Sequence, residues 1–404
     1  MTQRLVIIGN GMVGLRFLEN LLEAAPNLYE ITVIGAEPRA AYNRVLLSPF
    51  LAGEIAADDV AMKPTSWYAE NKVDLRLGQR AKTLDAKSKS ITLDSGDTLS
   101  FDICVLATGS KPIRLPIPGA DQLKGVHTFR DFDDVTTFRS VAQSGRPAVV
   151  IGGGLLGIET AYGLARAGVE VHLVHLMDRL MERQLDAQGG AILKSALEER
   201  GIEVHLEAAT EVILDDGQGS VSGVRLRDGK QIPGDIVVMA VGVQANTDLA
   251  KEASLDVGRG IKVSDTLETS APGVFALGEC AEHLGVCYGL VEPGYDQALV
   301  LAHHLADQPT LYAGNVLSTN LKVSGVPVFS AGDFSGDDTH SVITQDEAHK
   351  SYRRLFVKDN NLVGVVLVGD TADALWYRDL IAERTDISPF KDALAFGPAF
   401  ANAA

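Results

Sequence analysis

Two glycine triplets in the chain share the spacing G-x-G-x-x-G, and each triplet follows a short apolar run. The triplets are Gly9, Gly11 and Gly14, and Gly152, Gly154 and Gly157. In this pattern the first glycine permits a tight turn, the second lets the backbone approach a pyrophosphate, and the third lets a helix pack on a strand. The diphosphate then lies at the helix N-terminus, where free N–H groups and the helix dipole favour negative charge. The spacing therefore predicts two sites for dinucleotide cofactors.

A single triplet is weak evidence because many glycine turns have this spacing, but here the surrounding sequence repeats as well. Each triplet is followed by a helix-like pattern and then by a second apolar strand, Ile31–Ile34 in the first copy and Val169–Val174 in the second. Further along the chain, the apolar run Phe101–Gly109 resembles Gly234–Gly242, and both runs end on glycine. Matching segments in matching order predict two related domains with parallel sheets, one domain inserted in the other.

The length and the charge of the chain restrict its class. With 404 residues the chain is long enough for two or three domains. Asp and Glu outnumber Lys and Arg by 53 to 36, and the resulting net charge of −17 repels phosphate backbones, so we expect no nucleic-acid partner. No apolar run has the length of a transmembrane helix or the character of a signal peptide. We therefore expect a cytoplasmic protein that binds no membrane.

The cysteines and histidines do not predict a redox disulfide or a metal centre. Cys104, Cys280 and Cys287 form no C-x-x-C pair and no set that would hold an iron–sulfur cluster. His283 and the neighbouring histidines His303-His304 show no metal-ligand spacing, and surface or packing roles explain them better. We therefore expect no metal site.

The repeats predict an α/β fold with two Rossmann-like dinucleotide-binding domains, the second inserted in the first, and a small C-terminal α+β domain. We expect the first domain at 1–112 and 245–315, the inserted domain at 113–244 and a C-terminal interface domain at 316–404. The proline-rich segment Lys111–Pro118 suits an extended link between domains. Further expected elements are a helix over Tyr295–Ala306, a hairpin over Leu355–Val368 that turns at Asp359-Asn360-Asn361, and a helix around Ala372–Arg384.

Together these features resemble the two-dinucleotide-domain flavoprotein reductases of the pyridine nucleotide–disulfide oxidoreductase superfamily. Within it, the chain is most similar to the N-terminal flavoprotein half of bacterial assimilatory NAD(P)H nitrite reductase. The segments that carry the resemblance are Tyr42–Ser48, Leu180–Asp186, Gly278–His283, Tyr288–Val291 and Phe329–Phe334. They extend over nearly the whole chain, and the last three are fairly specific to that branch.

The resemblance implies that the first glycine loop binds FAD. The residues that it implies are Gly9, Gly11, Met12 and Gly14, Glu37 on the adenosine ribose, Arg44 near the adenosine or the diphosphate, Thr108 and Gly109 at the closing turn, and Gly278 and Glu279 on the ribityl chain. Glu37 also has the expected position just past a strand end, although a solvated loop acid is the alternative. Two positions depart from relatives: Glu279 replaces a common aspartate, and Pro49 replaces a lysine that many ferredoxin-reductase relatives carry beside the flavin.

The resemblance also implies that the second loop binds NADH or NADPH. The implied residues are Gly152, Gly154, Leu155, Gly157, Glu159, His175, Arg179 and Gly242. Glu159 lies near the nicotinamide and the flavin in relatives, but it could equally be a helix-start acid stabilised by the helix dipole. His175 occupies the strand end where an acid usually binds the ribose and selects NADH. Because His175 and Arg179 would tolerate a 2′-phosphate, the choice between the two nucleotides stays open.

The implied activity is hydride transfer from the nicotinamide to the flavin at the domain junction, followed by electron transfer to a protein partner. The chain ends near Phe396–Pro398, about where the cysteine-rich segments of full-length nitrite reductases would begin. We therefore expect an electron-transfer subunit serving an iron–sulfur or sirohaem protein in nitrite or nitrate reduction. The alternatives are a ferredoxin or rubredoxin reductase of another pathway and a flavin-bearing signalling module that binds NAD. The oligomeric state also stays open, a homodimer included.

Overall fold

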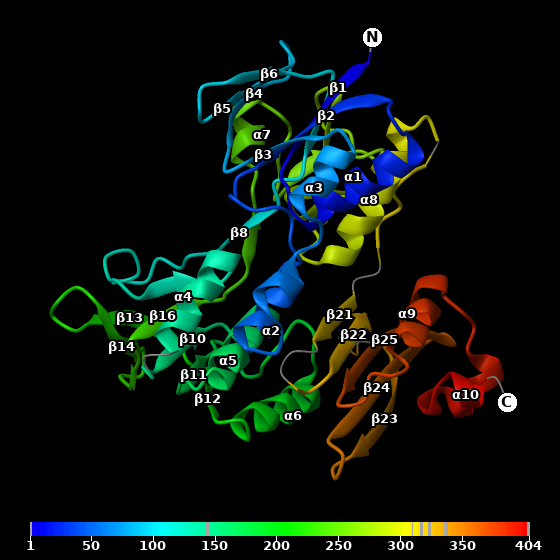
Figure 1. Cartoon of the computed structure of the whole chain (residues 1–404). Coiled ribbons are helices and arrows are strands. Elements are labelled where there is room, and N and C mark those ends of the chain that lie inside the picture. The colour runs from blue at the N-terminus through cyan, green and yellow to red at the C-terminus, as the bar shows by residue number, and fades with distance from the viewer. Residues whose placement is uncertain are drawn as a thin grey trace. The chain divides into compact units, whose positions relative to one another are not determined.

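The computed structural model describes residues 2–142, 145–308, 310–315, 318–321, 325–334, 336 and 338–401. The chain forms two compact units (Figure 1). The first unit comprises Met1–Leu46, Ala56–Lys111 and Val243–Asn315, and the second comprises Leu47–Ile55, Pro112–Gly242 and Val316–Ala404. Residues 316 and 317, where the predicted third domain begins, lie outside the described residues. The three-domain division stays a prediction.

The first unit contains a parallel sheet in the order β19-β7-β1-β2-β3. Its strands are β1 (Gln3–Ile8), β2 (Tyr29–Gly35), β3 (Asp74–Leu77), β7 (Ile103–Leu106) and β19 (Val274–Ala276). Successive residues of β1 are buried on opposite faces. Leu5 and Ile7 pack in a cluster with helices α1 (Met12–Ala24) and α8 (Val291–Leu305), whereas Val6 and Ile8 pack on the other face. There they meet a small antiparallel sheet, β4 (Ala81–Asp85), β5 (Ser90–Leu93) and β6 (Thr98–Ser100).

The second unit repeats this arrangement with a parallel sheet in the order β12-β11-β10-β16-β9. Its strands are β9 (Val126–Thr128), β10 (Ala148–Ile151), β11 (Val171–Val174), β12 (Ile202–His205) and β16 (Ile236–Met239). Its helices are α4 (Phe132–Ala142), α5 (Leu155–Arg166) and α6 (Ala187–Glu198), and β13 (Thr210–Asp215), β14 (Val221–Leu226) and β15 (Gln231–Pro233) form its small antiparallel sheet. The expected pair of Rossmann-like folds with parallel strands is therefore confirmed.

A third sheet, also in the second unit, is antiparallel in the order β21-β22-β25-β24-β23. Its strands are β21 (Ser318–Leu321), β22 (Val328–Gly332), β23 (His340–Asp346), β24 (Ser351–Lys358) and β25 (Asn361–Val368), and helix α9 (Ala374–Glu383) packs against it. The predicted hairpin and helix are confirmed. The turn is tighter than expected, because only Asp359 and Asn360 lie outside the strands, both with positive φ. Two residues in this conformation suit the right-handed twist of a hairpin.

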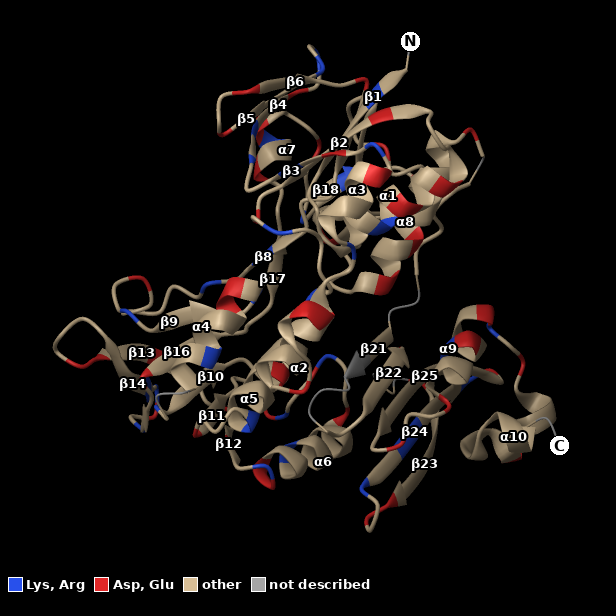
Figure 2. Ribbon diagram, in the orientation of Figure 1, with Lys and Arg blue, Asp and Glu red and all other residues tan. Residues whose placement is uncertain are grey.

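Shorter elements connect these sheets. They are η1 (Arg44–Leu46), η2 (Ala57–Val60), α3 (Thr65–Glu70), β8 (Ser110–Pro112), β17 (Val243–Ala245), α7 (Asp248–Glu252), β18 (Ile261–Val263), η3 (Gly278–Cys280), β20 (Ala281–His283), η4 (Ser388–Phe396) and α10 (Pro398–Ala401). Figure 2 shows acidic residues spread over many elements, α1, α8 and α9 among them. Within the described ranges, no helix has both the length and the apolar character that crossing a bilayer requires.

Helix α2 (Leu47–Leu51) groups with the second unit, although it lies within the stretch that the sequence assigns to the first domain. The reason is apolar contact. The ring of Phe50 stacks on Phe132 of α4 at a centroid distance of 5.2 Å. Leu51 lies against Gly163 of α5 so closely that a Cβ at that glycine would lie 2.8 Å from the leucine Cγ. The glycine therefore lets α2 lie directly on α5.

This close approach makes a prediction about Gly163→Ala. Alanine is the better helix former by about 1 kcal/mol, but the clash with Leu51 outweighs this gain, because overpacking costs about 1–3 kcal/mol. We expect the variant to lose about 1 kcal/mol in the free energy of unfolding, measured by urea titration. In a Leu51→Ala background the leucine Cγ and Cδ atoms are gone and only the Cβ of residue 51 remains, at 3.2 Å from the added methyl, so the cost of the same substitution should fall. An equal cost in both backgrounds would show that the Leu51 side chain does not lie against Gly163.

Candidate cofactor-binding site

The first glycine loop joins β1 to α1 and holds the helix N-terminus against the sheet. Gly9 has a φ of +120°, and a Cβ there would lie 2.1 Å from the carbonyl oxygen of Ala107. A Cβ at Gly14 would lie 2.4 Å from the carbonyl oxygen of Gly9, whereas one at Gly11 would meet no atom within 4 Å. Among the described residues α1 has no side-chain cap, and its first turn carries no acid. Its first N–H groups are therefore available to an anion above Gly11.

The second glycine loop, between β10 and α5, has the same geometry. Gly152 has a φ of +122°, and a Cβ there would lie 2.3 Å from the carbonyl oxygen of Ala240. A Cβ at Gly157 would lie 1.8 Å from the carbonyl oxygen of Gly152, and one at Gly154 would again point into open space. The helix begins at Leu155, again without a side-chain cap in the part of the chain that the structure describes. Each glycine of the triplet thus has the same role in both loops.

Asn10, inside the first loop, gives a test of whether a cofactor fits there. Its Oδ1 accepts a hydrogen bond from the hydroxyl of Tyr68 at 3.0 Å. Its Nδ2 is buried and has no hydrogen-bond partner among the described residues. A buried donor without an acceptor costs free energy, so a protein rarely keeps one. An oxygen of a bound dinucleotide would supply the missing acceptor, and the loop therefore fits such a group.

Glu37 and Arg44, both expected on the adenosine side of FAD, lie together after β2 and beside Met12 at the start of α1. The Arg44 guanidinium pairs with the Glu37 carboxylate, and the Arg44 backbone N–H donates to the sulfur of Met12 at 3.3 Å. Tyr42 completes the group, because its hydroxyl donates to Glu37 Oε2 at 2.8 Å and its ring lies 5.0 Å from the Arg44 guanidinium carbon. The side chains of Glu37 and Arg44 remain 31% and 27% exposed, so a ligand can still reach both. Their contact with ribose stays a prediction.

Glu279 lies beside the turn that closes the first unit's sheet. Its Oε2 accepts a hydrogen bond from the Ser110 hydroxyl at 2.8 Å, immediately after the predicted pair Thr108 and Gly109. Gly109 and Gly278 have φ values of +64° and +77°, which residues with a Cβ adopt only with strain. The structure therefore brings the closing turn and the acid together. Nothing in this geometry tests the predicted bond to the ribityl chain.

Glu159 is a largely buried carboxyl in the second turn of α5. Burial raises the pKa of Glu159 to about 7, and the hydrogen bond from the Ser48 hydroxyl, at 3.0 Å, opposes that shift. The first turn of α5 carries no acidic residue, so Glu159 lies beyond the N–H groups that stabilise a helix-start acid. Of the two readings from the sequence, the structure disfavours the dipole-stabilised acid. A buried carboxyl with a strongly shifted pKa is typical of functional sites.

His175 is buried at the end of β11, and both of its ring nitrogens have partners. Its Nδ1 accepts a hydrogen bond from the Gly153 backbone N–H at 3.0 Å. Its Nε2 lies 3.1 Å from Glu182 Oε2. Because Nδ1 accepts, Nε2 must carry the proton and donate to the carboxylate. The strand end therefore does hold an acid, although Glu182 comes from the loop after the strand rather than from the strand itself.

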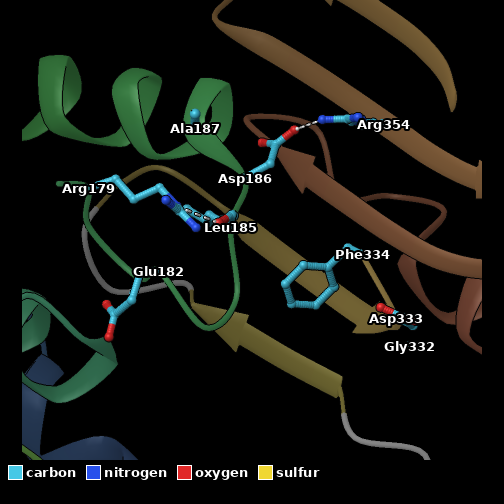
Figure 3. A pocket seen from close by; sticks show the side chains of 9 residues that line it. All are labelled: Arg179, Glu182, Leu185, Asp186, Ala187, Gly332, Asp333, Phe334 and Arg354. Carbon is cyan, nitrogen blue, oxygen red and sulfur yellow. Dashed lines mark hydrogen bonds and ion pairs between the residues drawn. The ribbon is translucent and has the colours of Figure 1, made fainter. Parts of the chain in front are cut away.

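The loop between β11 and α6 lines a cavity of about 480 Å³ together with the C-terminal sheet (Figure 3). Arg179 and Glu182 lie on its wall, but Arg179 is already engaged with the Asp178 carboxylate at 3.0 Å and the Leu185 carbonyl at 3.2 Å. Asp186 ends the loop and caps α6, because its Oδ1 accepts from the Gly189 N–H at 2.9 Å. The cavity thus adjoins the predicted nucleotide site.

Asp186 also binds the C-terminal sheet through its other oxygen. Its Oδ2 accepts from the Tyr352 hydroxyl at 2.6 Å and from Arg354 Nη1 at 2.9 Å. Burial and the neighbouring Asp186 carboxylate raise the pKa of Tyr352, so the phenol stays protonated and keeps donating. The Asp186 carboxylate therefore joins the end of this loop both to helix α6 and to strand β24.

Gly242 and His283, which were also named from the sequence, each have a hydrogen-bond partner within the protein. Gly242 has a φ of +112°, and its carbonyl accepts from the Ile113 N–H at 2.9 Å. His283 Nε2 lies 2.8 Å from Asp265 Oδ1, and His303 and His304 lie in the last turn of α8.

Asn10, Ser48 and Glu182 were not among the site residues expected from the sequence. Asn10 lies within the glycine loop, so its position could have indicated it. Glu182 lies inside a segment that carries the family resemblance, but only the fold shows its contact with His175. Ser48 and Glu159 are 111 residues apart in sequence, and no local pattern links them.

Two protein-family profiles match the chain. A family profile described as pyridine nucleotide-disulphide oxidoreductase matches residues 3–304, and one described as rubredoxin NAD+ reductase C-terminal domain matches residues 318–385. The chain is 44% identical to a nitrite reductase [NAD(P)H] of Bacillus subtilis over 96% of this chain and 48% of that protein. It is 40% identical to the assimilatory nitrate reductase electron transfer subunit of Bacillus subtilis, over 96% of this chain and 50% of that protein. The chain thus spans about half the length of these relatives.

Among solved structures, a ferredoxin reductase from Rhodopseudomonas palustris superposes with a TM-score of 0.87 at 28% identity. The match covers 95% of each chain, so both units and the C-terminal sheet have counterparts in that structure.

The shifted pKa of Glu159 makes a prediction about stability and pH. Because the folded protein holds this proton up to about pH 7, against an ordinary value of 4.5, folding favours the protonated form between these two values. The contribution of Glu159 to the free energy of unfolding should therefore fall as the pH rises through this window. Glu159→Gln, which keeps the neutral shape, should lose that dependence and exceed the native protein by on the order of 1–3 kcal/mol at about pH 8.

The measurement is the free energy of unfolding against pH for the nucleotide-free protein. Ser48→Ala serves as the companion variant, because removing the bond to the carboxylate should extend the falling slope to higher pH. Parallel pH profiles for all three proteins would contradict a buried, titrating Glu159.

Proposed function

The chain belongs to the pyridine nucleotide-disulphide oxidoreductase family, whose members are NAD(P)H-dependent flavoprotein reductases, and we propose that it passes electrons from NAD(P)H through FAD to a separate protein redox centre. The observation that carries this proposal is the pair of glycine loops. Each loop presents an uncapped helix N-terminus and a middle glycine whose missing Cβ leaves open space. Two such loops in one chain suit two dinucleotides, one as resident cofactor and one as substrate.

The residues of the chain bind and orient these groups. When bound, FAD takes up a hydride from the reduced nicotinamide and passes on two electrons. Gly11 and Gly154 let the backbone reach the two diphosphates, and the N-termini of α1 and α5 stabilise their charge. Glu37 and Arg44 would hold the adenosine side of FAD, and Glu279 its ribityl chain. Glu159, with Ser48 as its donor, keeps a carboxyl of near-neutral pKa on the helix that follows the nicotinamide loop.

For the electron acceptor we propose a sirohaem or iron–sulfur protein of nitrite or nitrate reduction. The support is the likeness to a nitrite reductase and to a nitrate reductase electron transfer subunit, each over nearly the whole of this chain. A second candidate acceptor is rubredoxin or ferredoxin, favoured by the rubredoxin-reductase profile over residues 318–385 and by the likeness to a ferredoxin reductase.

For the nucleotide we propose a preference for NADH. The acid expected at the end of β11 is supplied by Glu182, which His175 orients from its Nε2. A carboxylate there accepts from the ribose 2′-hydroxyl and repels a 2′-phosphate. Arg179, the cation that could favour NADPH, is engaged by Asp178 and by a backbone carbonyl.

The cradle geometry makes a prediction about the paired variants Gly11→Ala and Gly154→Ala. Neither added Cβ meets a described protein atom within 4 Å, so both cofactor-free variants should fold and lose at most about 1 kcal/mol, because alanine is a poorer N-cap than glycine. Because each Cβ enters the space of a diphosphate, Gly11→Ala should lower the bound flavin, whereas Gly154→Ala should keep it. In stopped-flow reduction of the flavin, Gly154→Ala should raise the half-saturating NADH concentration about tenfold, a loss of about 1.4 kcal/mol.

The same assay tests electron delivery. The reduced protein should be reoxidised faster by an iron–sulfur or sirohaem acceptor than by dissolved oxygen. A purified chain that stays colourless after incubation with FAD would refute the flavoprotein assignment. A flavin that NADH reduces but that no protein acceptor reoxidises would instead refute only the electron-transfer role.

The role of Glu182 makes a separate prediction about nucleotide choice. Glu182→Gln removes the negative charge but keeps an acceptor for the 2′-hydroxyl. The dissociation constant for NADPH should fall about tenfold, as expected when about 1.4 kcal/mol of repulsion is lost, while that for NADH changes little. Binding is measured by titration of the oxidised protein with each nucleotide. Glu198→Gln, which neutralises an exposed acid of α6 paired with Lys194, is the matched control, and an equal shift in both variants would exclude a local role for Glu182.

A further inference from the structure

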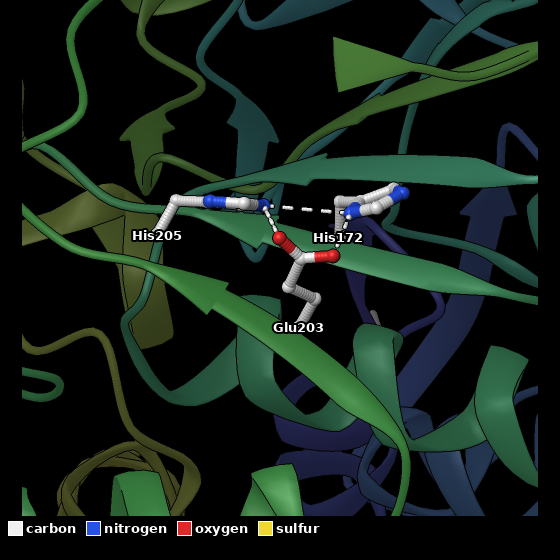
Figure 4. A group of neighbouring side chains, drawn as sticks. All are labelled: His172, Glu203 and His205. Atoms are coloured by element: carbon white, nitrogen blue, oxygen red, sulfur yellow. Dashed lines mark hydrogen bonds and ion pairs between the residues drawn. The ribbon is translucent and has the colours of Figure 1, made fainter.

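Two histidines and a carboxylate converge on one face of the second unit's parallel sheet, apart from the predicted cofactor residues (Figure 4). His172 lies on β11, and Glu203 and His205 lie on the adjacent edge strand β12. His172 is the register partner of Glu203, and His205 follows Glu203 by two positions, so the pleat of the strand directs all three to the same side. We propose that these residues form a binding site for a divalent transition-metal ion of the zinc type.

The separations of the donor atoms carry the proposal. His172 Nδ1 lies 3.4 Å from His205 Nε2 and 3.3 Å from Glu203 Oε2, and His205 Nε2 lies 3.3 Å from Glu203 Oε1. Ligands bound to zinc at about 2.0–2.1 Å and at tetrahedral angles lie about 3.3–3.4 Å from one another. Each of these three pairs of donor atoms thus has the separation of two corners of a zinc tetrahedron, with the two histidines facing different oxygens of Glu203. The carboxylate can offer either oxygen with a small rotation.

The surroundings of His172 add a second observation. Its side chain is only 7% exposed, and its Nε2 is buried without a hydrogen-bond partner among the described residues. The Glu170 carboxylate lies 3.6 Å from that nitrogen. If Nδ1 binds a metal, Nε2 must carry the proton and can donate it to Glu170. A metal-binding histidine commonly donates to a carboxylate in this way, which fixes the tautomer that exposes the ligating lone pair.

The ligand set defines the class of metal. Two imidazoles with one carboxylate suit zinc and its neighbours in the first transition row, whereas magnesium and calcium prefer oxygen ligands alone. Glu203 is 59% exposed, so solvent can supply a water as the fourth ligand.

One charge opposes binding. Lys230 Nζ lies 3.2 Å from His205 Nδ1 and 3.8 Å from Glu203 Oε1. When His205 binds a metal through Nε2, its Nδ1 carries the proton and can no longer accept from Lys230. The lysine side chain is 52% exposed, so it can turn into solvent. Removing this ammonium should therefore strengthen metal binding, which is the opposite of what removing a ligand would do.

The test is equilibrium dialysis of the full chain, carrying its flavin and no affinity tag, against zinc chloride. We expect one zinc ion per chain, with binding weakened at least about tenfold in Glu203→Gln and in His205→Ala. Lys230→Gln should bind zinc more tightly than the native protein. Two matched controls should leave zinc binding unchanged: His349→Ala, which removes the exposed histidine beside Asp346, and Cys287→Ser, which removes the most exposed thiol.

A direct readout does not depend on folding of the variants. Crystals soaked in zinc should show an anomalous difference peak at the zinc edge between the three side chains. The proposal is overturned if the native protein binds no zinc, because the cluster is then only a hydrogen-bonded network. It is equally overturned if zinc binds but neither ligand variant weakens it, since the ion then lies elsewhere. Both outcomes are independent of the flavin and nucleotide assays.

Discussion

The whole arrangement depends on the close contact between the backbone of each glycine loop and the strand that passes behind it. In both units the first glycine leaves no room for a Cβ beside the carbonyl of Ala107 or Ala240, and the third glycine leaves none beside the first. These contacts bring the start of a long helix directly onto the edge of a sheet. The N–H groups of its first turn then point to one place, where no side chain of the helix competes for them. Cofactor binding is therefore prepared by the packing of the backbone before any polar side chain contributes.

Local patterns predicted most of the scaffold because its signals are short in range. The strands, the glycine loops, the hairpin and helix α9 all follow from spacing within about twenty residues. The exception among the elements is α2, which the sequence assigns to the first domain and which groups with the second unit. Its placement depends on Leu51 meeting Gly163 and on Phe50 meeting Phe132. Such contacts join residues far apart in sequence, and a pattern read along the chain contains no record of them.

The site shows the same division. Glycines and strand-end residues could be named from the sequence, but their partners could not. From the sequence, His175 replaces the acid that usually lies at this strand end. Only the fold shows that the Glu182 carboxylate lies against the His175 ring. Ser48 is an ordinary helix residue until it donates to Glu159. The cluster of His172, Glu203 and His205 was not predicted for a similar reason. It depends on the register between strands β11 and β12, which no spacing within one strand indicates.

Asp186 limits how the loop between β11 and α6 can move. One oxygen of this carboxylate caps α6, and the other holds Tyr352 and Arg354 of the C-terminal sheet. The loop that carries Arg179 and Glu182 is therefore held at its C-terminal end by hydrogen bonds to helix α6 and to strand β24. Any displacement of the loop backbone at Asp186 would have to break this cap or remove the charged donor Arg354 from the carboxylate. The position of this loop therefore depends on β24, and a substitution at Tyr352 or Arg354 would reach the loop through Asp186.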